Sequence, residues 1–159
     1  MQDRREGTAR RDCSFPNQIG AQPSSLQVTG SVTRWFLTVE TVLAIHGILI
    51  EETGGASGVR DLGSLESAVM RPQIGYYDGI SEEDAVLMES LTINHPFVDG
   101  NKRIAFATAG TFLLTNGYYI DCDSIEAHRH LMHLFDTQSF TFVELVAWQS
   151  NKVKPLPPV

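Results

Sequence analysis

The chain has 159 residues, which predicts a single domain, and its 42% apolar content is enough for a buried core. The net charge of -7 excludes the basic surface of a general nucleic-acid-binding protein, so any anion site must be local. No apolar run approaches the ~20 residues that cross a bilayer, and no signal-peptide core is present. Cys13 and Cys122 lie outside any metal-ligand spacing. We expect reduced thiols in a cytoplasmic protein, with no membrane and no direct nucleic-acid partner.

Residues 1–30 are polar and have no hydrophobic periodicity, so we expect a disordered N-terminal tail. The pairs Arg4–Arg5 and Arg10–Arg11 are not followed by an apolar stretch, which favours a solvated tail over an export signal. The folded domain is expected over residues 33–152. The proline-rich segment 153–159 is expected to be a loose C-terminal tail.

Apolar residues at helical spacing predict a helix over 36–50 that ends at Gly54–Gly55, and a short helix over 64–70 stopped by Pro72. The segment 54–63 between them is rich in glycine and serine and is expected to form a loop or a short hairpin.

The next helix is expected to have Ser81 in its N-cap motif, followed by acids, and to end at His95–Pro96. A helix that begins after Gly100 is apolar almost all round, which predicts a central buried helix. An extended piece at 118–120 and two more helices follow, the last with a capping box at Thr141–Glu144. The predicted fold is a compact all-α domain with one small hairpin at most.

The segment His95–Arg103, with the sequence HPFVDGNKR, gathers residue types that bind phosphate. A proline ends the preceding helix directly after His95, so the imidazole lies at a helix end. Gly100 permits a close approach of the backbone to a ligand. Lys102 and Arg103 open the next helix, whose N–H groups and positive dipole end bind anions. Two cations there are unfavourable for the helix itself and favour a bound anion.

Asp99 places a carboxylate beside that anion, where it could hold Mg2+. Phe97 is expected to insert into the core and fix the loop. Taken singly, these residues have ordinary alternatives: Asp99 as a helix N-cap, His95 as a satisfied histidine and Gly100 as a turn residue. Helix capping does not require the whole set of groups found within these nine residues, which are a base, a carboxylate, a glycine, the Asn101 amide and two cations. Together they predict a nucleotide-phosphate site.

Other patterns are weaker. His130 and His133 would share a helix face, but His128 would not, and no acid or cysteine completes a metal set, so a solvated face is favoured. His46 is predicted to be a packed or boundary histidine. Residues 58–64 have the glycine spacing of a P-loop without its lysine or a preceding strand, which excludes that motif.

The segment His95–Arg103 resembles the Fic motif, H-x-F-x-[DE]-G-N-x-R, in the form found in the Doc (death-on-curing) branch of the Fic/Doc family. Phe36–Glu40, Gly58–Ala68 and Arg71–Gln73 resemble Doc-type sequence in the same order, so the resemblance extends over about Phe36 to Asn151. It implies a compact Fic/Doc helical bundle with a small β-hairpin flap.

The resemblance also implies transfer of a phosphate-containing group from ATP to a protein hydroxyl. His95 would be the general base, a role that histidine often has in enzymes, and Asp99 would hold Mg2+. Pro96 and Phe97 would have structural roles. The phosphoryl oxygens would be bound by the residues that open the following helix, namely Gly100, Asn101, Lys102 and Arg103.

Two positions depart from the AMP-transferring form of the motif: Lys102 replaces a glycine, and Phe106 replaces a second arginine. The Doc branch shares both and resembles a kinase that phosphorylates translation elongation factor Tu, so we favour phosphoryl transfer. Adenylylation remains the alternative, because Asp99–Gly100 is shared with many AMP-transferring relatives. The intact His95 argues against a catalytically idle binding module. A metal-dependent phosphohydrolase is weaker still, since only one histidine and one aspartate converge.

The segment 54–63 lies where Fic proteins carry the flap that binds the target by strand addition. Val59, Arg60 and Asp61 would line it, and an ordinary surface loop is equally compatible. The sequence has no match to the S/T-x-x-x-E-[G/N] helix by which some Fic proteins inhibit themselves. A toxin without it implies a toxin–antitoxin pair with a separate Phd-like antitoxin, whose C-terminal segment would occupy grooves near the site.

Overall fold

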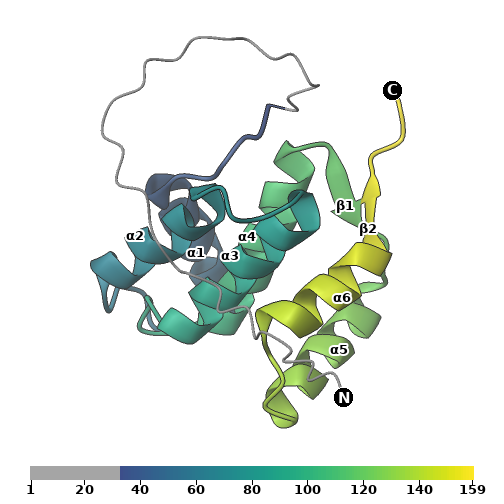
Figure 1. Ribbon diagram of the computed structural model, residues 1–159. Helices are drawn as coiled ribbons and strands as arrows, with labels where there is room; N and C mark the ends of the chain where they lie inside the picture. Colours follow the sequence, from purple (N-terminus) through teal and green to yellow (C-terminus); the bar gives the residue numbers. More distant parts are fainter. Residues whose placement is uncertain (1–32) are drawn as a thin grey trace, which may run out of the picture. The chain divides into compact units, whose positions relative to one another are not determined.

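The computed structural model describes residues 33–159, and the tail predicted over 1–30 lies outside the described residues. Within 33–159 the chain forms six α-helices, one 3-10 turn and one two-stranded antiparallel sheet (Figure 1). The predicted all-α fold is therefore confirmed. The elements are α1 (Val39–Thr53), α2 (Leu62–Met70), the turn η1 (Arg71–Gln73), α3 (Ile80–Asn94), α4 (Asn101–Thr115), β1 (Tyr118–Ile120), α5 (Ser124–Asp136), α6 (Phe142–Lys152) and β2 (Val153–Pro155).

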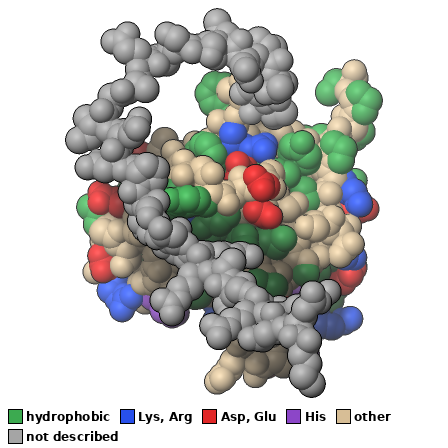
Figure 2. Space-filling model, viewed as in Figure 1, with side chains coloured by type: hydrophobic (Ala, Val, Ile, Leu, Met, Phe, Trp, Pro, Cys, Tyr) green, Lys and Arg blue, Asp and Glu red, His purple; other side chains and the backbone are tan. Residues whose placement is uncertain are grey.

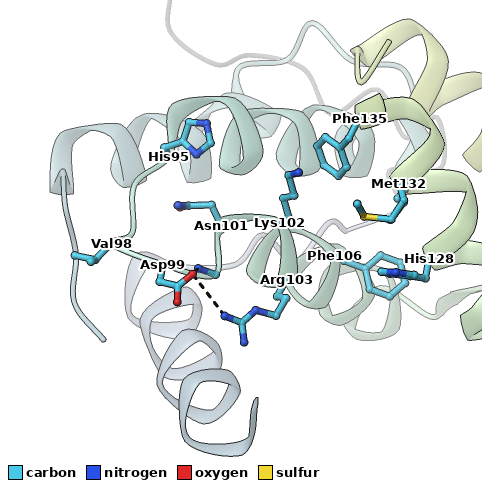
Figure 3. Close-up of a pocket in the computed structure, with 12 residues that line it drawn as sticks. His95, Val98, Asp99, Asn101, Lys102, Arg103, Phe106, His128, Met132 and Phe135 are labelled. Atoms are coloured by element: carbon cyan, nitrogen blue, oxygen red, sulfur yellow. Dashed lines mark hydrogen bonds and ion pairs between the residues drawn. The ribbon is translucent and has the colours of Figure 1, made fainter. Parts of the chain in front are cut away.

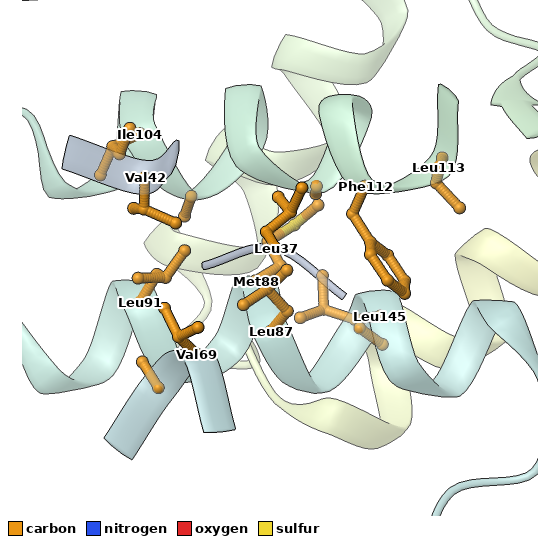
Figure 4. Close-up of a cluster of buried hydrophobic side chains, with 14 of the residues drawn as sticks. Leu37, Val42, Val69, Leu87, Met88, Leu91, Ile104, Phe112, Leu113 and Leu145 are labelled. Carbon is orange, nitrogen blue, oxygen red and sulfur yellow. The ribbon is translucent and has the colours of Figure 1, made fainter. Parts of the chain in front are cut away.

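The helix α3 lies at the centre of the fold and packs against α2, α4 and α6. All of its residues from Asp84 to Thr92 are buried, and its apolar side chains meet those of α1, α2, α4 and α6 in one core (Figure 4). The sequence predicted that α4 would be the central buried helix. This was only partly right, because Phe106 and Leu114 of α4 are exposed. An apolar surface all round a helix is found both in helices buried on every side and in helices with one face lining a cavity, so the pattern does not distinguish them.

Two predicted helix starts were wrong in detail. The N-cap of α3 is Gly79, and Ser81 lies inside the first turn, because the buried Ile80 begins the helix. Thr141 is the N-cap of α6, but its side chain makes no capping hydrogen bond, so the predicted capping box does not form. Glu89 of α3 replaces it: its Oε1 accepts from the Phe142 N–H at 2.7 Å.

The chain after α6 is not a loose tail from residue 153 onward. Val153–Pro155 form β2, which pairs antiparallel with β1, and the Leu156 N–H donates to the Gly117 carbonyl. The partner strand lies more than 30 residues earlier in the sequence, so nothing local in a proline-rich segment indicates the pairing. Proline is tolerated here because the sheet has only edge strands.

The segment 54–63 forms a loop followed by the start of α2, and the sheet lies elsewhere. Its one β-bridge joins Val59 to Phe97 of the motif. No helix of the described part is long and apolar enough to cross a membrane. Acidic, basic and hydrophobic side chains are interspersed on the face of the described residues that Figure 2 shows.

Candidate active site

His95 ends α3 in the left-handed conformation, with φ 45° and ψ 55°. Such angles cost a non-glycine residue roughly 1–2 kcal/mol. The turn stops the helix before Pro96 and leaves the imidazole exposed at the wall of a cavity, away from the helix stripe. The prediction that this histidine lies at a helix end is confirmed.

The segment 58–61 pairs through its backbone with the motif loop at 96–98. This pairing fixes the predicted flap to the loop that follows His95. The hydrogen bonds run from the Arg60 and Asp61 N–H groups to the Pro96 carbonyl, at 2.7 and 3.1 Å, and from the Val98 N–H to the Gly58 carbonyl, at 3.0 Å.

The side chains of the predicted flap have different roles. Arg60 donates from Nε to the His95 carbonyl at 2.7 Å and from Nη2 to the Asn94 carbonyl at 3.1 Å. A cation is favourable at these last carbonyls of α3. Asp61 instead caps α2, accepting from the Ser64 N–H at 3.0 Å, and this bond lowers the pKa of its carboxyl. Val59 is exposed.

Phe97 and Asn101 hold the motif loop from within. The Phe97 ring is 1% exposed, which confirms that it inserts into the core. The Asn101 side chain accepts from the Phe97 N–H at 2.9 Å and donates to the Phe97 carbonyl at 3.0 Å. Because both ends of the amide are engaged, Asn101 offers an incoming anion its backbone N–H, while its side chain shapes the loop.

His46 of α1 holds the same loop from outside. Its ring is 5% exposed and stacks on the Phe97 ring, with centroids 3.9 Å apart and an interplanar angle of 11°. Its Nε2 lies 2.9 Å from the Asp99 carbonyl oxygen. The sequence predicted a packed histidine and missed this bond. No pattern within α1 could have revealed it, since the partner is 53 residues away.

The N-terminus of α4 faces the cavity without a side-chain cap. Gly100 is the N-cap with φ 79°, a left-handed conformation in which a side chain would be strained. The first main-chain bond of the helix runs from the Ile104 N–H to the Gly100 carbonyl. The N–H groups of Asn101, Lys102 and Arg103 precede it and are therefore available to an anion.

Asp99 lies beside this helix end. Its Oδ1 accepts from the Gly100 N–H at 2.6 Å, and its Oδ2 accepts from the Ala56 N–H at 3.3 Å. The first of these bonds is the main cause that lowers the pKa of the Asp99 carboxyl, so the group is ionised at neutral pH. Gly55 has a φ of 122°, which would strain any side chain, and a Cβ there would lie 2.5 Å from Asp99 Oδ2, so glycine is favoured at this position.

The two cations of the motif differ in their surroundings. Arg103 donates from Nη1 to Thr53 Oγ1 and to the Gly54 carbonyl, at the end of α1, and its Nη2 lies 3.6 Å from Asp99 Oδ1. Lys102 extends across the cavity, and its Nζ lies 4.0 Å from the centre of the Phe135 ring. Among residues 33–159 the Lys102 ammonium has the Phe135 ring as its partner and no ion pair, which leaves its charge accessible to a ligand.

The cavity has a volume of about 510 Å³. Its motif end carries the polar groups, and its other end is a mostly apolar wall from α4 and α5, so both a charged and an apolar part of one ligand would fit (Figure 3). The residues that line it are His95, Val98, Asp99, Gly100, Asn101, Lys102, Arg103, Phe106, His128, Leu131, Met132 and Phe135.

The histidines of α5 are placed separately. His128 lines the cavity, whereas His130 stacks on Trp148 with centroids 4.9 Å apart, and burial lowers its pKa. His133 is exposed. Among the described residues no three His, Cys, Asp or Glu side chains are grouped as metal ligands. A cation at this site would therefore depend on Asp99 and on ligands brought by a substrate.

The fold and the site define an all-α protein in which a helix N-terminus without a side-chain cap lies at a cavity beside a helix-end histidine. Residues 36–113 match the model of the Fic/DOC family. Toxin Doc of Mycolicibacterium smegmatis is 42% identical over 93 residues, covering 55% of this chain and 69% of that protein. Protein kinase doc of Escherichia phage P1 is 31% identical over 88 residues, covering 53% and 70%. The chain belongs to the Fic/Doc family, and the predicted resemblance to its Doc branch is confirmed.

Proposed function

We propose that this protein is a Doc-like toxin that transfers the γ-phosphoryl group of ATP to a hydroxyl of a target protein, with elongation factor Tu as the first target to test. The names of its relatives, a Doc toxin and a Doc protein kinase, support this proposal. The observation that carries it is the meeting of His95, Asp99 and the uncapped N-terminus of α4 at one end of the cavity.

The helix end supplies the phosphate-binding groups. Three successive N–H groups at the start of α4, the α4 dipole and the accessible Lys102 all favour a multiply charged anion. The apolar wall at the other end of the cavity suits the less polar part of a nucleotide. Positioning and charge stabilisation account for most of the catalysis in phosphoryl transfer, and these N–H groups and Lys102 would contribute to both.

The residues present fit a magnesium–nucleotide complex. Mg2+ is usually held by one or two carboxylates together with water and substrate phosphates, and Asp99 provides an ionised carboxylate next to the phosphate-binding end. When bound, the cation would neutralise charge on the phosphates. Asp99 keeps its carboxylate directed to this end through the bonds from Gly100 and Ala56.

In the proposed reaction the target oxygen forms a bond to the γ-phosphorus while the bond from that phosphorus to the bridging oxygen breaks, and ADP leaves. His95 accepts the proton of the hydroxyl. Its imidazole is exposed at the cavity wall, and Arg60 and the flap pairing hold the backbone on either side of it. The left-handed turn thus presents the base to an incoming protein.

Lys102 and Phe106 support phosphoryl transfer over AMP transfer. Both line the cavity at the positions where the AMP-transferring motif has glycine and a second arginine. Phe106 presents an apolar ring where a cation would otherwise bind a further phosphate. Adenylylation of the target is the alternative outcome of the same experiment.

The proposal implies regulation in trans. A Phd-like antitoxin in the cytoplasm would restrain the enzyme by binding near the cavity. Copurification of the two proteins, with loss of target modification in the complex, would support this part.

The decisive experiment mixes the purified protein with ATP, Mg2+ and elongation factor Tu and measures the intact mass of the target. A phosphate increment supports the proposal, and an AMP increment supports adenylylation instead. If neither this factor nor any other protein of a cell lysate is modified, and His95→Ala is as toxic as the wild type, the protein acts by binding.

A further inference from the structure

We propose that His46 is a positioning residue that sets the direction of the Gly100 N–H group, and through it the anion-binding start of α4. This inference rests on the proposed function and extends it to a helix outside the motif. His46 lies on α1, is buried and lines neither the cavity nor the flap.

The geometry of one peptide unit carries the inference. A carbonyl oxygen can only accept, so the contact of 2.9 Å requires that His46 Nε2 carries a hydrogen and donates it to the Asp99 carbonyl. The carbonyl of Asp99 and the N–H of Gly100 belong to the same planar trans peptide and point in opposite directions. Holding the carbonyl toward α1 therefore turns the Gly100 N–H away from α1, toward the Asp99 carboxylate, to which it donates at 2.6 Å.

The ring of His46 makes a second contact that holds the motif loop. It stacks on Phe97, whose backbone is held on both sides by Asn101. The loop is thus clamped at Phe97 by a ring and at Asp99 by a hydrogen bond, both from one side chain. With the Asp99–Gly100 peptide fixed, the left-handed Gly100 that follows can start α4 in only one direction.

The two contacts can be separated by substitution. His46→Phe retains a flat ring against Phe97 and loses the donor, whereas His46→Gln retains an N–H donor at the same distance along the side chain and loses the ring. His133→Phe, at an exposed position of α5, is the matched control. If His46 had only a structural role, His46→Phe and His46→Gln would behave alike in both readouts whenever their thermal stabilities are equal.

The first readout is the Gly100 amide in the full chain, followed by NMR chemical shift and hydrogen exchange. We expect His46→Phe to shift this signal and to speed its exchange, His46→Gln to remain close to wild type, and His133→Phe to change neither. The inference is overturned if the Gly100 amide of His46→Phe behaves as in the wild type, because the peptide would then hold its direction without the donor.

The second readout is steady-state kinetics with ATP and the protein that the enzyme is found to modify. We expect His46→Phe to lower kcat by roughly 10–100-fold, the size of effect seen when a hydrogen bond that orients a metal ligand is lost, with the KM for the target protein unchanged. His46→Gln should restore most of kcat. Equal losses in both variants, proportional to their loss of thermal stability, contradict the inference. A wild type that modifies no target would contradict the proposed function alone, since the amide readout does not depend on it.

Discussion

The N-termini of α4 and α6 are alike in their missing side-chain caps but differ in the charged groups that surround them. Neither helix is capped by the side chain of its own N-cap residue, Gly100 in α4 and Thr141 in α6. At α6 a carboxylate from within the fold fills the position: Glu89 accepts from the Phe142 N–H. At α4 the first N–H groups face a cavity of about 510 Å³ instead.

The charged groups near the two helix starts differ as well. Glu89 also pairs with Arg71, whose Nη1 lies 3.2 Å from its Oε2, so the α6 end is neutralised by the protein itself. The second helical position is the cation Lys102 in α4 and the neutral Val143 in α6. A helix start supplied with cations and left open to solvent is suited to an anion from outside. The start of α6 is thus capped from within the fold, whereas the start of α4 is left open to a cavity.

The largest effect is expected at His95, which ends α3 and lines the same cavity as the open end of α4. His95→Ala should lower the rate of target modification by roughly 10²–10⁴-fold, because the hydroxyl loses its proton acceptor. The side chain is exposed, so the fold should be retained. Initial rates of phosphate incorporation measure the effect, and His133→Ala is the control. A rate within a few fold of wild type would remove His95 from the chemistry.

Substitution of Glu89, which caps the N-terminus of α6, should lower stability and leave activity unchanged. Glu89→Ala leaves the Phe142 N–H and Arg71 without their shared acceptor, and we expect a loss of about 2–3 kcal/mol in the free energy of unfolding. Glu89→Gln retains an acceptor and should lose less. Urea unfolding measures both, and kcat at low temperature should stay close to wild type. Equal stability of Glu89→Ala and wild type would show that the carboxylate does not cap α6.

The packing of α3 on α6 should also make stability depend on pH. Asp84 is fully buried with Gln149 as its partner at 2.7 Å, and burial raises the pKa of its carboxyl to about 8. The folded state therefore holds this proton from about pH 4 to pH 8, while the unfolded state releases it. The contribution of Asp84 to stability is complete below pH 4 and decreases as the pH rises toward 8, by at most about 1.4 kcal/mol per pH unit.

Asp84→Asn removes this proton equilibrium. We expect its stability to vary less than that of the wild type between pH 5 and pH 8. Denaturant titrations at several pH values measure the slope. The same pH slope in the wild type and in Asp84→Asn would mean that Asp84 is ionised in the fold.

The smallest change in stability is expected at Lys102, in the first turn of α4. Lys102→Glu places an acid at the second position of α4, which favours the helix by about 0.3–1 kcal/mol and offsets the removal of the ammonium group from the Phe135 ring. The variant should be no less stable than wild type, yet bind ATP about tenfold more weakly or worse. Val143→Glu is the matched change in α6 and should leave ATP binding unaltered. Unfolding curves and ATP titrations decide the matter. Tight ATP binding by Lys102→Glu would show that this helix end does not hold the phosphates.

The sequence by itself predicted the helices, the loop between α3 and α4 and the helix-end position of His95, since these depend on spacing and local chemistry along the chain. The resemblance of its motifs to those of the Fic/Doc family predicted the family. It also predicted that Phe97 would be buried. It could not predict β2, because a strand of three residues exists only through its partner. Nor could it predict that Glu89 replaces the capping box.

The tertiary structure alone decided how the motif loop is supported. His46, Arg60 and Gly55 come from α1 and the segment after it, and they meet the motif at Asp99 and His95 across long sequence separations. Hydrogen bonds and close approaches of this kind depend on how the helices pack, and no periodicity in either segment records them. The sequence therefore predicted which groups would do the chemistry, and the packing of α1 and the flap determined how those groups are held.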